Sequence, residues 1–91
     1  MNSQIKVIIM EPNELKALIE KSIPDAKVEV VDTTGTKDHF SAVVISKSFE
    51  ELSLIEQHQS VYKAVGAFMT KEVHALQLKT YSPKKWAEQN S

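Results

Sequence analysis

The fold is decided by the stretch Val73-His74-Ala75-Leu76-Gln77-Leu78-Lys79-Thr80-Tyr81-Ser82-Pro83-Lys84-Lys85-Trp86. Its first part, up to Tyr81, is rich in β-forming residues and alternates between two faces, which predicts a strand. Ser82 then offers a side-chain oxygen to the free amides of a helix, and Pro83 suits the first helical position. His74 opens the otherwise apolar face of this strand. This histidine is either hydrogen-bonded to a partner there or has a chemical role there.

Two further strands are predicted earlier in the chain. Apolar residues at every second position predict one strand over residues 27–32 and another from Phe40 to about Ser46. The segment between them, residues 33–37, is a turn cluster that contains Gly35. Two strands around a short turn predict a hairpin.

Three helices complete the expected order. Pro12 opens the first helix, which ends at Ile23 before a proline. Ser53, with a glutamate three residues later, is a capping box that begins a long helix to about Met69. Its apolar side is expected to carry Leu54, Val61, Tyr62, Val65 and Met69. Gly66 inside this helix is expected to mark close backbone packing. A short last helix, from Pro83 to about Asn90, needs Trp86 to dock it.

The resulting order is helix, strand, strand, helix, strand, helix. It predicts a single α+β domain over residues 12–90, with a three-stranded sheet and helices on one face. Residues 1–11 are expected to form a loosely held N-terminal arm, since nothing in the sequence fixes their pairing.

Composition excludes several classes of function. The net charge of −1 gives no global attraction to nucleic acid or membrane, and all 11 basic residues are lysines, so the arginine fork that reads guanine edges is missing. The chain has no cysteine, hence no disulfide, no thiolate nucleophile and no cysteine-rich metal site. No apolar run reaches the length of a membrane span or of a signal-peptide core. We expect a soluble, cytoplasmic protein without membrane contact.

Candidate chemistry is limited to histidines and lysines. His39 stands where the hairpin turn meets the second strand, His58 borders the buried side of the long helix, and His74 opens the third strand. Each can be a hydrogen-bonded structural histidine or a ligand. No serine, histidine and acid converge as a nucleophilic site requires, so we expect no enzyme. Lys79, Lys84 and Lys85 form a small basic patch, which fits a solvated helix start as well as a phosphate site.

With these residues in hand, the chain resembles the BolA-like family over roughly residues 12–88. No single motif is specific, but the ordered set is. The matching pieces are His39-Phe40, the strand Val43-Val44-Ile45-Ser46, Phe49, Ser53, Gln57-His58-Gln59 with Val61-Tyr62, His74-Ala75-Leu76, Thr80, Pro83 and Trp86.

The resemblance implies a fold similar to class II KH domains and a protein partner. Proteins of this family pair with monothiol glutaredoxins that carry a CGFS motif. The pair shares a [2Fe-2S] cluster, for which glutaredoxin and glutathione supply thiolates. The family's histidine ligand falls on His74, and a second ligand comes from the hairpin loop. Here that loop has neither Cys nor His, so His39 at its end is the nearest substitute. The resemblance thus implies an adaptor in iron–sulfur cluster assembly, trafficking or iron and redox regulation.

The alternative is a nucleic-acid-binding transcriptional regulator of stress response and cell morphology, as some family members are described. It would use the KH-like fold and the patch of Lys79, Lys84 and Lys85 to bind DNA. The long helix carries Gln57-His58-Gln59 where the family commonly has Arg-His-Arg, which removes two charges from such a face. By itself the chain is expected to be a monomer or a weak homodimer.

Overall fold

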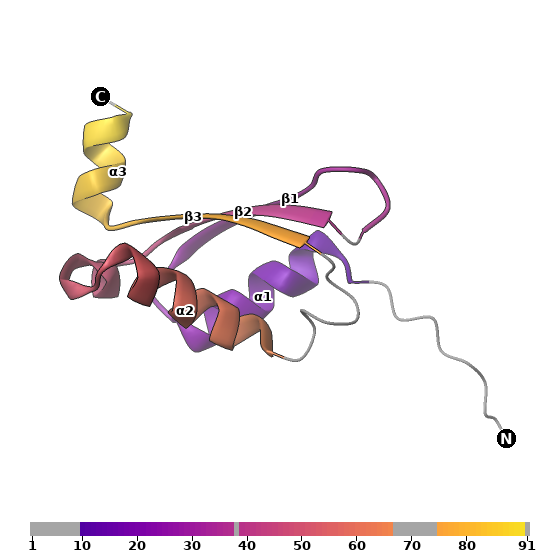
Figure 1. The fold of residues 1–91 in the computed structure, drawn as a ribbon, viewed down its shortest axis with the longest axis horizontal. Coiled ribbons are helices and arrows are strands. Elements are labelled where there is room, and N and C mark those ends of the chain that lie inside the picture. Colours follow the sequence, from indigo (N-terminus) through magenta and orange to yellow (C-terminus); the bar gives the residue numbers. More distant parts are fainter. Residues whose placement is uncertain (1–9, 38, 67–74, 91) are drawn as a thin grey trace, which may run out of the picture.

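The computed structural model describes residues 10–37, 39–66 and 75–90, and its order of elements confirms the predicted one. Figure 1 shows the chain as a ribbon. The link after the second strand is a short 3-10 helix. The elements are α1 (Pro12–Ser22), β1 (Lys27–Asp32), β2 (His39–Ile45), η1 (Lys47–Glu51), α2 (Leu54–Val65), β3 (Ala75–Tyr81) and α3 (Pro83–Gln89).

The three strands form one mixed sheet in the order β1-β2-β3. β1 and β2 pair antiparallel, as the predicted hairpin requires, with Lys27 opposite Ile45 and Asp32 opposite Phe40. β2 and β3 pair parallel, from His39 opposite Ala75 to Ile45 opposite Tyr81. A parallel pair needs a crossover connection, and α2 lies within it.

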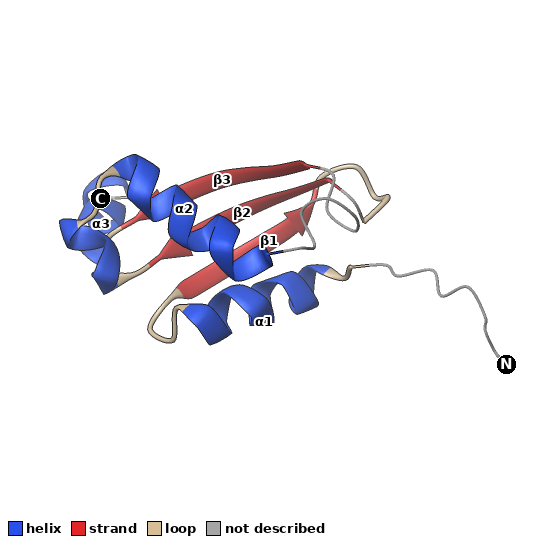
Figure 2. Cartoon of the chain, turned by 60° about the horizontal axis from the view of Figure 1, so that its bottom comes forward, coloured by secondary structure: helices blue, strands red, loops and turns tan. Residues whose placement is uncertain are grey.

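Both longer helices cover one face of this sheet, while α3 rises from the end of β3 on the other side (Figures 1 and 2). Alternation along β2 points Phe40, Ala42 and Val44 into the layer between sheet and helices, where all three are buried. Leu15 and Ile19 of α1 and Val61 and Val65 of α2 are buried in the same core. The core therefore lies between the sheet and the α1–α2 layer.

Two predicted helix caps are present. Ser53 Oγ accepts a hydrogen bond from the Glu56 backbone N–H (3.2 Å), and Glu56 Oε1 accepts one from the Ser53 N–H (2.9 Å). Ser82 Oγ accepts a hydrogen bond from the Lys85 N–H (3.2 Å) at the start of α3. These contacts satisfy amides that a helix leaves unpaired at its N-terminus.

Trp86 docks the last helix on a neighbouring ring. No residue of α3 is buried, and the Trp86 ring meets the Tyr81 ring edge to face, with centroids 5.2 Å apart. The helix is therefore held by an aromatic contact at the end of β3.

Three expectations about α2 are wrong, those for Gly66, Leu54 and Tyr62. The helix ends at Val65, and Gly66 follows it with a φ of 62°, a backbone conformation that glycine adopts without strain. A Cβ at Gly66 would meet no atom within 4 Å, so close packing is not the reason for this glycine. Leu54 and Tyr62, expected on the buried side, are exposed, and the buried residues of the helix are Val61 and Val65. Met69 lies outside the described residues.

Part of the predicted arm also falls outside the described chain, namely residues 1–9. Met10 is buried in the core, and Glu11 caps α1, since its N–H donates to Glu14 Oε1 at 2.9 Å.

Candidate functional site

Pairing of β2 with β3 places His39 beside the start of β3. His39 opens β2, is half-buried and lies opposite Ala75 in the parallel register. His74 lies outside the described residues, but it directly precedes Ala75 in the chain. The register therefore aligns His39 with the residue next to His74, although the two are far apart in the sequence.

The hairpin turn before His39 is organised by one carboxylate. Asp32 Oδ1 accepts hydrogen bonds from the Gly35 N–H (2.9 Å) and the Thr34 N–H (3.3 Å), and Oδ2 accepts one from the Lys37 N–H (3.0 Å). Gly35 and Lys37 both have positive φ, 80° and 61°. An aspartate that satisfies turn amides is a familiar device, and the sequence analysis did not identify it at Asp32.

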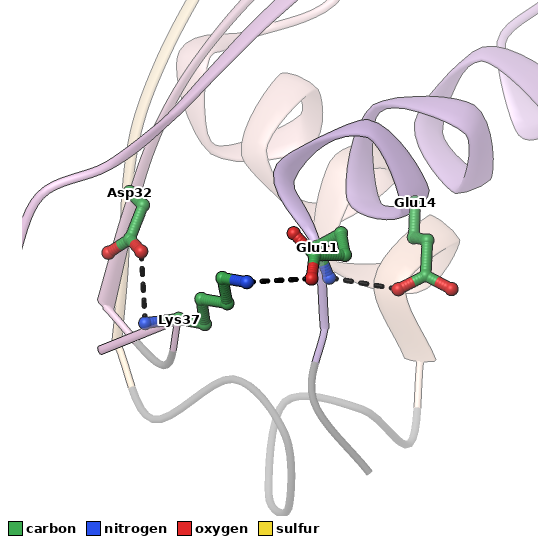
Figure 3. A network of polar contacts seen from close by, with 4 residues as sticks. All are labelled: Glu11, Glu14, Asp32 and Lys37. Atoms are coloured by element: carbon green, nitrogen blue, oxygen red, sulfur yellow. Dashed lines mark hydrogen bonds and ion pairs between the residues drawn. The ribbon is translucent and has the colours of Figure 1, made fainter. Parts of the chain in front are cut away.

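An ion pair ties this turn to the first helix. Lys37 Nζ lies 2.8 Å from Glu11 Oε2, and Figure 3 shows the chain of contacts from Asp32 through Lys37 to Glu11 and Glu14. The hydrogen bond and the charge of Glu11 raise the pKa of Lys37 above its ordinary value. Both side chains are solvent-exposed, so the pair mainly orients the turn and adds little stability.

The β2 end of the hairpin is also fixed. The His39 carbonyl accepts hydrogen bonds from the Thr33 N–H (2.9 Å) and from Thr33 Oγ1 (3.1 Å). Since Phe40 points into the core, alternation turns the His39 side chain to the face of the sheet opposite α1 and α2. The backbone of His39 is thus held by two strands and a turn.

The described residues do not form a complete metal site by themselves. Within residues 10–37, 39–66 and 75–90, no group of three or more His, Asp or Glu side chains is arranged to hold a metal ion, and the chain has no cysteine. Of the two candidate imidazole donors, that of His39 lies in the strand beside the start of β3, and His74 lies outside the described residues. Such a set is too small for a complete iron–sulfur site, but it fits one that a thiolate-bearing partner completes.

The predicted basic patch is only partly basic. Lys79 is exposed on β3, and Lys84 and Lys85 are exposed at the start of α3. Around the two α3 lysines a shallow pocket of about 340 Å³ is also lined by Glu50 and Glu88. The carboxylates offset the field of the lysines at the place where a phosphate would bind.

Gln57 has a role that sequence reasoning missed. Its Nε2 donates hydrogen bonds to the backbone carbonyls of Phe49 (3.2 Å) and Leu52 (3.0 Å). In the sequence, Gln57 stands out only as part of the Gln57-His58-Gln59 segment, where the family commonly has Arg-His-Arg. Its amide group joins α2 to η1, which a charge count does not reveal.

Asp25 was missed as well. Its Oδ1 accepts a hydrogen bond from Ser46 Oγ (2.8 Å) and its Oδ2 accepts one from the Lys47 N–H (2.8 Å). These two bonds, the backbone one first, hold the pKa of Asp25 below its ordinary value of 3.8. The contact fastens the loop after α1 to the end of β2. Its signal in the sequence, one aspartate after a proline, is too common to be specific.

None of the helices in the described parts of the chain is long and apolar enough to cross a membrane.

Comparison with known proteins agrees with this architecture. The BolA-like protein family matches residues 10–85. The structure of a BolA protein homologue from Coxiella burnetii is 31% identical, with 87% of this chain and 99% of that chain covered and a TM-score of 0.75. The solution structure of yeast Fra2 is 29% identical, with 86% and 85% covered and a TM-score of 0.69.

A curated relative carries a functional name. The DNA-binding transcriptional regulator BolA of Haemophilus influenzae is 30% identical over 56 residues, which is 62% of this chain and 54% of that protein. The family match spans α1 to the start of α3, and the solved relatives share the fold of nearly the whole chain. The protein therefore belongs to the BolA-like family.

Proposed function

We propose that this protein is a non-enzymatic adaptor that shares a [2Fe-2S] cluster with a monothiol glutaredoxin of the CGFS type. In this proposal His74 is the main ligand from this chain, and His39 is the candidate second ligand. Membership of the BolA-like family supports the partner class. The register of β2 and β3 supports a site at this end of the sheet, because it aligns His39 with Ala75, the neighbour of His74. Alternation turns the His39 side chain to the face opposite Phe40 and Leu76, so the choice of His39 as the second ligand depends on the family resemblance.

The donor chemistry fits this role. A chain without cysteine offers only weak ligation of its own to an iron–sulfur cluster, whereas the glutaredoxin and glutathione bring thiolates. When bound, a cluster with imidazole in place of thiolate carries less negative charge and has a higher reduction potential. The neutral imidazole is the ligand, so binding weakens at low pH. The Asp32-closed turn and its ion pair to Glu11 keep the start of β2 in place for the shared site.

Anaerobic cluster reconstitution tests the proposal. A CGFS glutaredoxin and glutathione are reconstituted with and without this protein, and visible absorption and circular dichroism are recorded. We expect a changed spectrum that reverts with His74→Ala, while His58→Ala, a matched change of a histidine on α2, leaves it unchanged. An unchanged spectrum without co-elution of the two proteins would reject the adaptor role. Far-UV circular dichroism of each variant separates lost ligation from unfolding.

The second candidate is a nucleic-acid-binding regulator. It is favoured by the similarity to the DNA-binding transcriptional regulator BolA of Haemophilus influenzae and by the exposure of Lys79, Lys84 and Lys85. The absence of arginine and the carboxylates of Glu50 and Glu88 beside two of these lysines count against it.

Filter binding to duplex DNA over a range of salt concentrations distinguishes this candidate. Tight binding at low salt, a steep fall with salt and loss on Lys84→Glu with Lys85→Glu would support it. Binding that the double variant does not change would reject this patch as the contact.

A further inference from the structure

The side of the sheet that faces away from α1 and α2, here called the outer face, carries several apolar side chains. Alternation and register place Val31 of β1, Val43 and Ile45 of β2 and Tyr81 of β3 on it. Val31 is 57% exposed, and the other three are half-buried. A sheet face that meets only water is typically polar. The outer face therefore has more apolar surface than contact with water explains.

The last helix bounds one end of this face, where it rises from the end of β3 (Figure 1). Trp86 lies at this end and shares a shallow pocket of about 330 Å³ with Lys27, Ile45 and Lys47. Trp86 is 37% exposed, and no residue of α3 is buried. The aromatic end of the outer face is thus also accessible within the described parts of the chain.

One row of residues across the outer face carries opposite charges at its two ends. Glu29 of β1 pairs with Val43 of β2, and Val43 pairs with Lys79 of β3. The row therefore reads acid, apolar, base, with about 10 Å between the two edge strands. Glu29 and Lys79 are both exposed, and neither has an ion-pair partner among the described residues.

Such a row is complementary to a second copy of itself. When two outer faces are stacked about a twofold axis parallel to the strands, β2 covers β2 and each edge strand covers the opposite edge strand. Glu29 of each copy then faces Lys79 of the other, which gives two ion pairs. An axis along the row, across the strands, would instead lay β1 on β1 and bring Glu29 against Glu29. The charges thus select the axis parallel to the strands.

We propose that the outer face binds the outer face of a second copy of this chain about this twofold axis. Val43 meets its own counterpart at the centre of the contact. In the next row, Lys27 lies over Tyr81 of the second copy, where an ammonium group is attracted to the ring. The inference goes beyond the proposed function and does not depend on the cluster ligands, so each can fail without the other.

The dimensions of the outer face predict a weak dimer. Three strands are about 15 Å wide and the paired part of β2 is about 20 Å long, so each copy buries on the order of 300–400 Å². Stable protein interfaces bury about 800 Å² per partner. We therefore expect a dissociation constant of about 0.1–1 mM, which is typical of transient contacts.

Two measurements on the full-length chain test the proposal. Sedimentation equilibrium from micromolar to millimolar concentration reports the stoichiometry. Nuclear magnetic resonance of the 15N-labelled chain over the same range locates the contact. We expect a monomer–dimer equilibrium, with concentration-dependent amide shifts that centre on Glu29, Val43 and Lys79 and leave α1 unchanged.

Charge reversal then assigns the arrangement. Glu29→Lys replaces two opposite-charge contacts by two like-charge contacts, and we expect it to weaken the dimer at least about fivefold. Lys79→Glu should have the same effect. The double variant Glu29→Lys with Lys79→Glu keeps the net charge of the unmodified chain and should restore the dimer. Glu51→Lys, at an exposed site on η1, controls for the change in net charge and should have little effect.

Three results would overturn the proposal. They are a chain that stays monomeric at millimolar concentration, shifts that centre on α2 and spare the sheet, and a double variant that dimerises no better than the two single ones. Two other occupants are tested with the same labelled chain. Shifts on the outer face that appear only with a CGFS glutaredoxin would assign the face to that partner. Shifts there that appear only with a single-stranded oligonucleotide would assign it to nucleic acid.

Discussion

Thr80 Oγ1 donates a hydrogen bond to Gln57 Oε1 across 2.7 Å, and this contact joins β3 to the helix that packs on it. The same Gln57 side chain donates from Nε2 to the carbonyls of Phe49 and Leu52. Thr80 is buried and Gln57 is half-buried, so these polar atoms have limited access to water. One amide side chain thus connects η1, α2 and β3.

Gln57→Ala is expected to lower the free energy of unfolding by about 1–3 kcal/mol, because it removes the hydrogen-bond partner of the Thr80 hydroxyl and of the Leu52 carbonyl, and one of the two partners of the Phe49 carbonyl. Urea unfolding followed by far-UV circular dichroism measures the change. Gln59→Ala, at an exposed position two residues away, serves as the control and should have little effect. Equal effects of the two substitutions would show that the network contributes nothing specific.

Gly66→Ala gives opposite results under two interpretations. If Gly66 lay inside a helix, its replacement by alanine would raise the free energy of unfolding of the protein by about 1 kcal/mol. The observed φ of 62° and ψ of −133° at the end of α2 instead predict a loss of about 1–3 kcal/mol, the cost of holding an L-residue in a sparsely populated region. The space around Gly66 is open, so no steric clash contributes. Thermal unfolding measures whether Gly66→Ala lowers or raises the stability of the protein. A more stable variant would contradict the observed backbone conformation.

Asp25 predicts a pH dependence of stability. Its pKa is lowered in the folded chain by the Lys47 N–H and the Ser46 hydroxyl, so folding favours the carboxylate form. The stabilisation is therefore complete above the unfolded-state pKa, near 3.8, and is lost as the pH falls through the lower folded-state pKa.

The matching experiment compares Asp25→Asn with the unmodified chain by urea unfolding between pH 7 and pH 2. We expect the variant to be less stable at pH 7 and the difference to shrink below pH 4. Glu29→Gln, at an exposed position of β1, controls for the loss of one charge. If the difference in stability between Asp25→Asn and the unmodified chain stays constant with pH, ionisation of the Asp25 carboxyl group does not contribute to the stability.

His39→Ala tests the second ligand of the proposed shared cluster. We expect a smaller change in the visible circular dichroism of the reconstituted complex than His74→Ala causes, because the family resemblance assigns the main ligand to His74. An effect as large as that of His74→Ala would establish His39 as an equal ligand. If His39→Ala has no effect on the spectrum, the ligand from the hairpin region is a residue other than His39.

Local signals in the sequence were sufficient for most element boundaries. The start of α1 at Pro12, the limits of β1 and the caps Ser53 and Ser82 agree with the structure. Each depends on a proline, a capping side chain or an alternation within a few residues. Gly66 shows the limit of such signals, since a helix interior and a helix end both tolerate glycine and only the backbone φ distinguishes them.

The sequence by itself determined the class of the domain, the hairpin, the family resemblance and the residue types available for chemistry, because these depend on local patterns and composition. Only the tertiary structure decided that β2 pairs parallel with β3, that His39 lies opposite Ala75, and that Gln57 meets Thr80. These contacts join residues more than twenty positions apart in the chain, as the numbering shows. Their register is set by the shared core that β2, β3 and α2 bury together, a property of the packed layers that no single stretch of sequence carries.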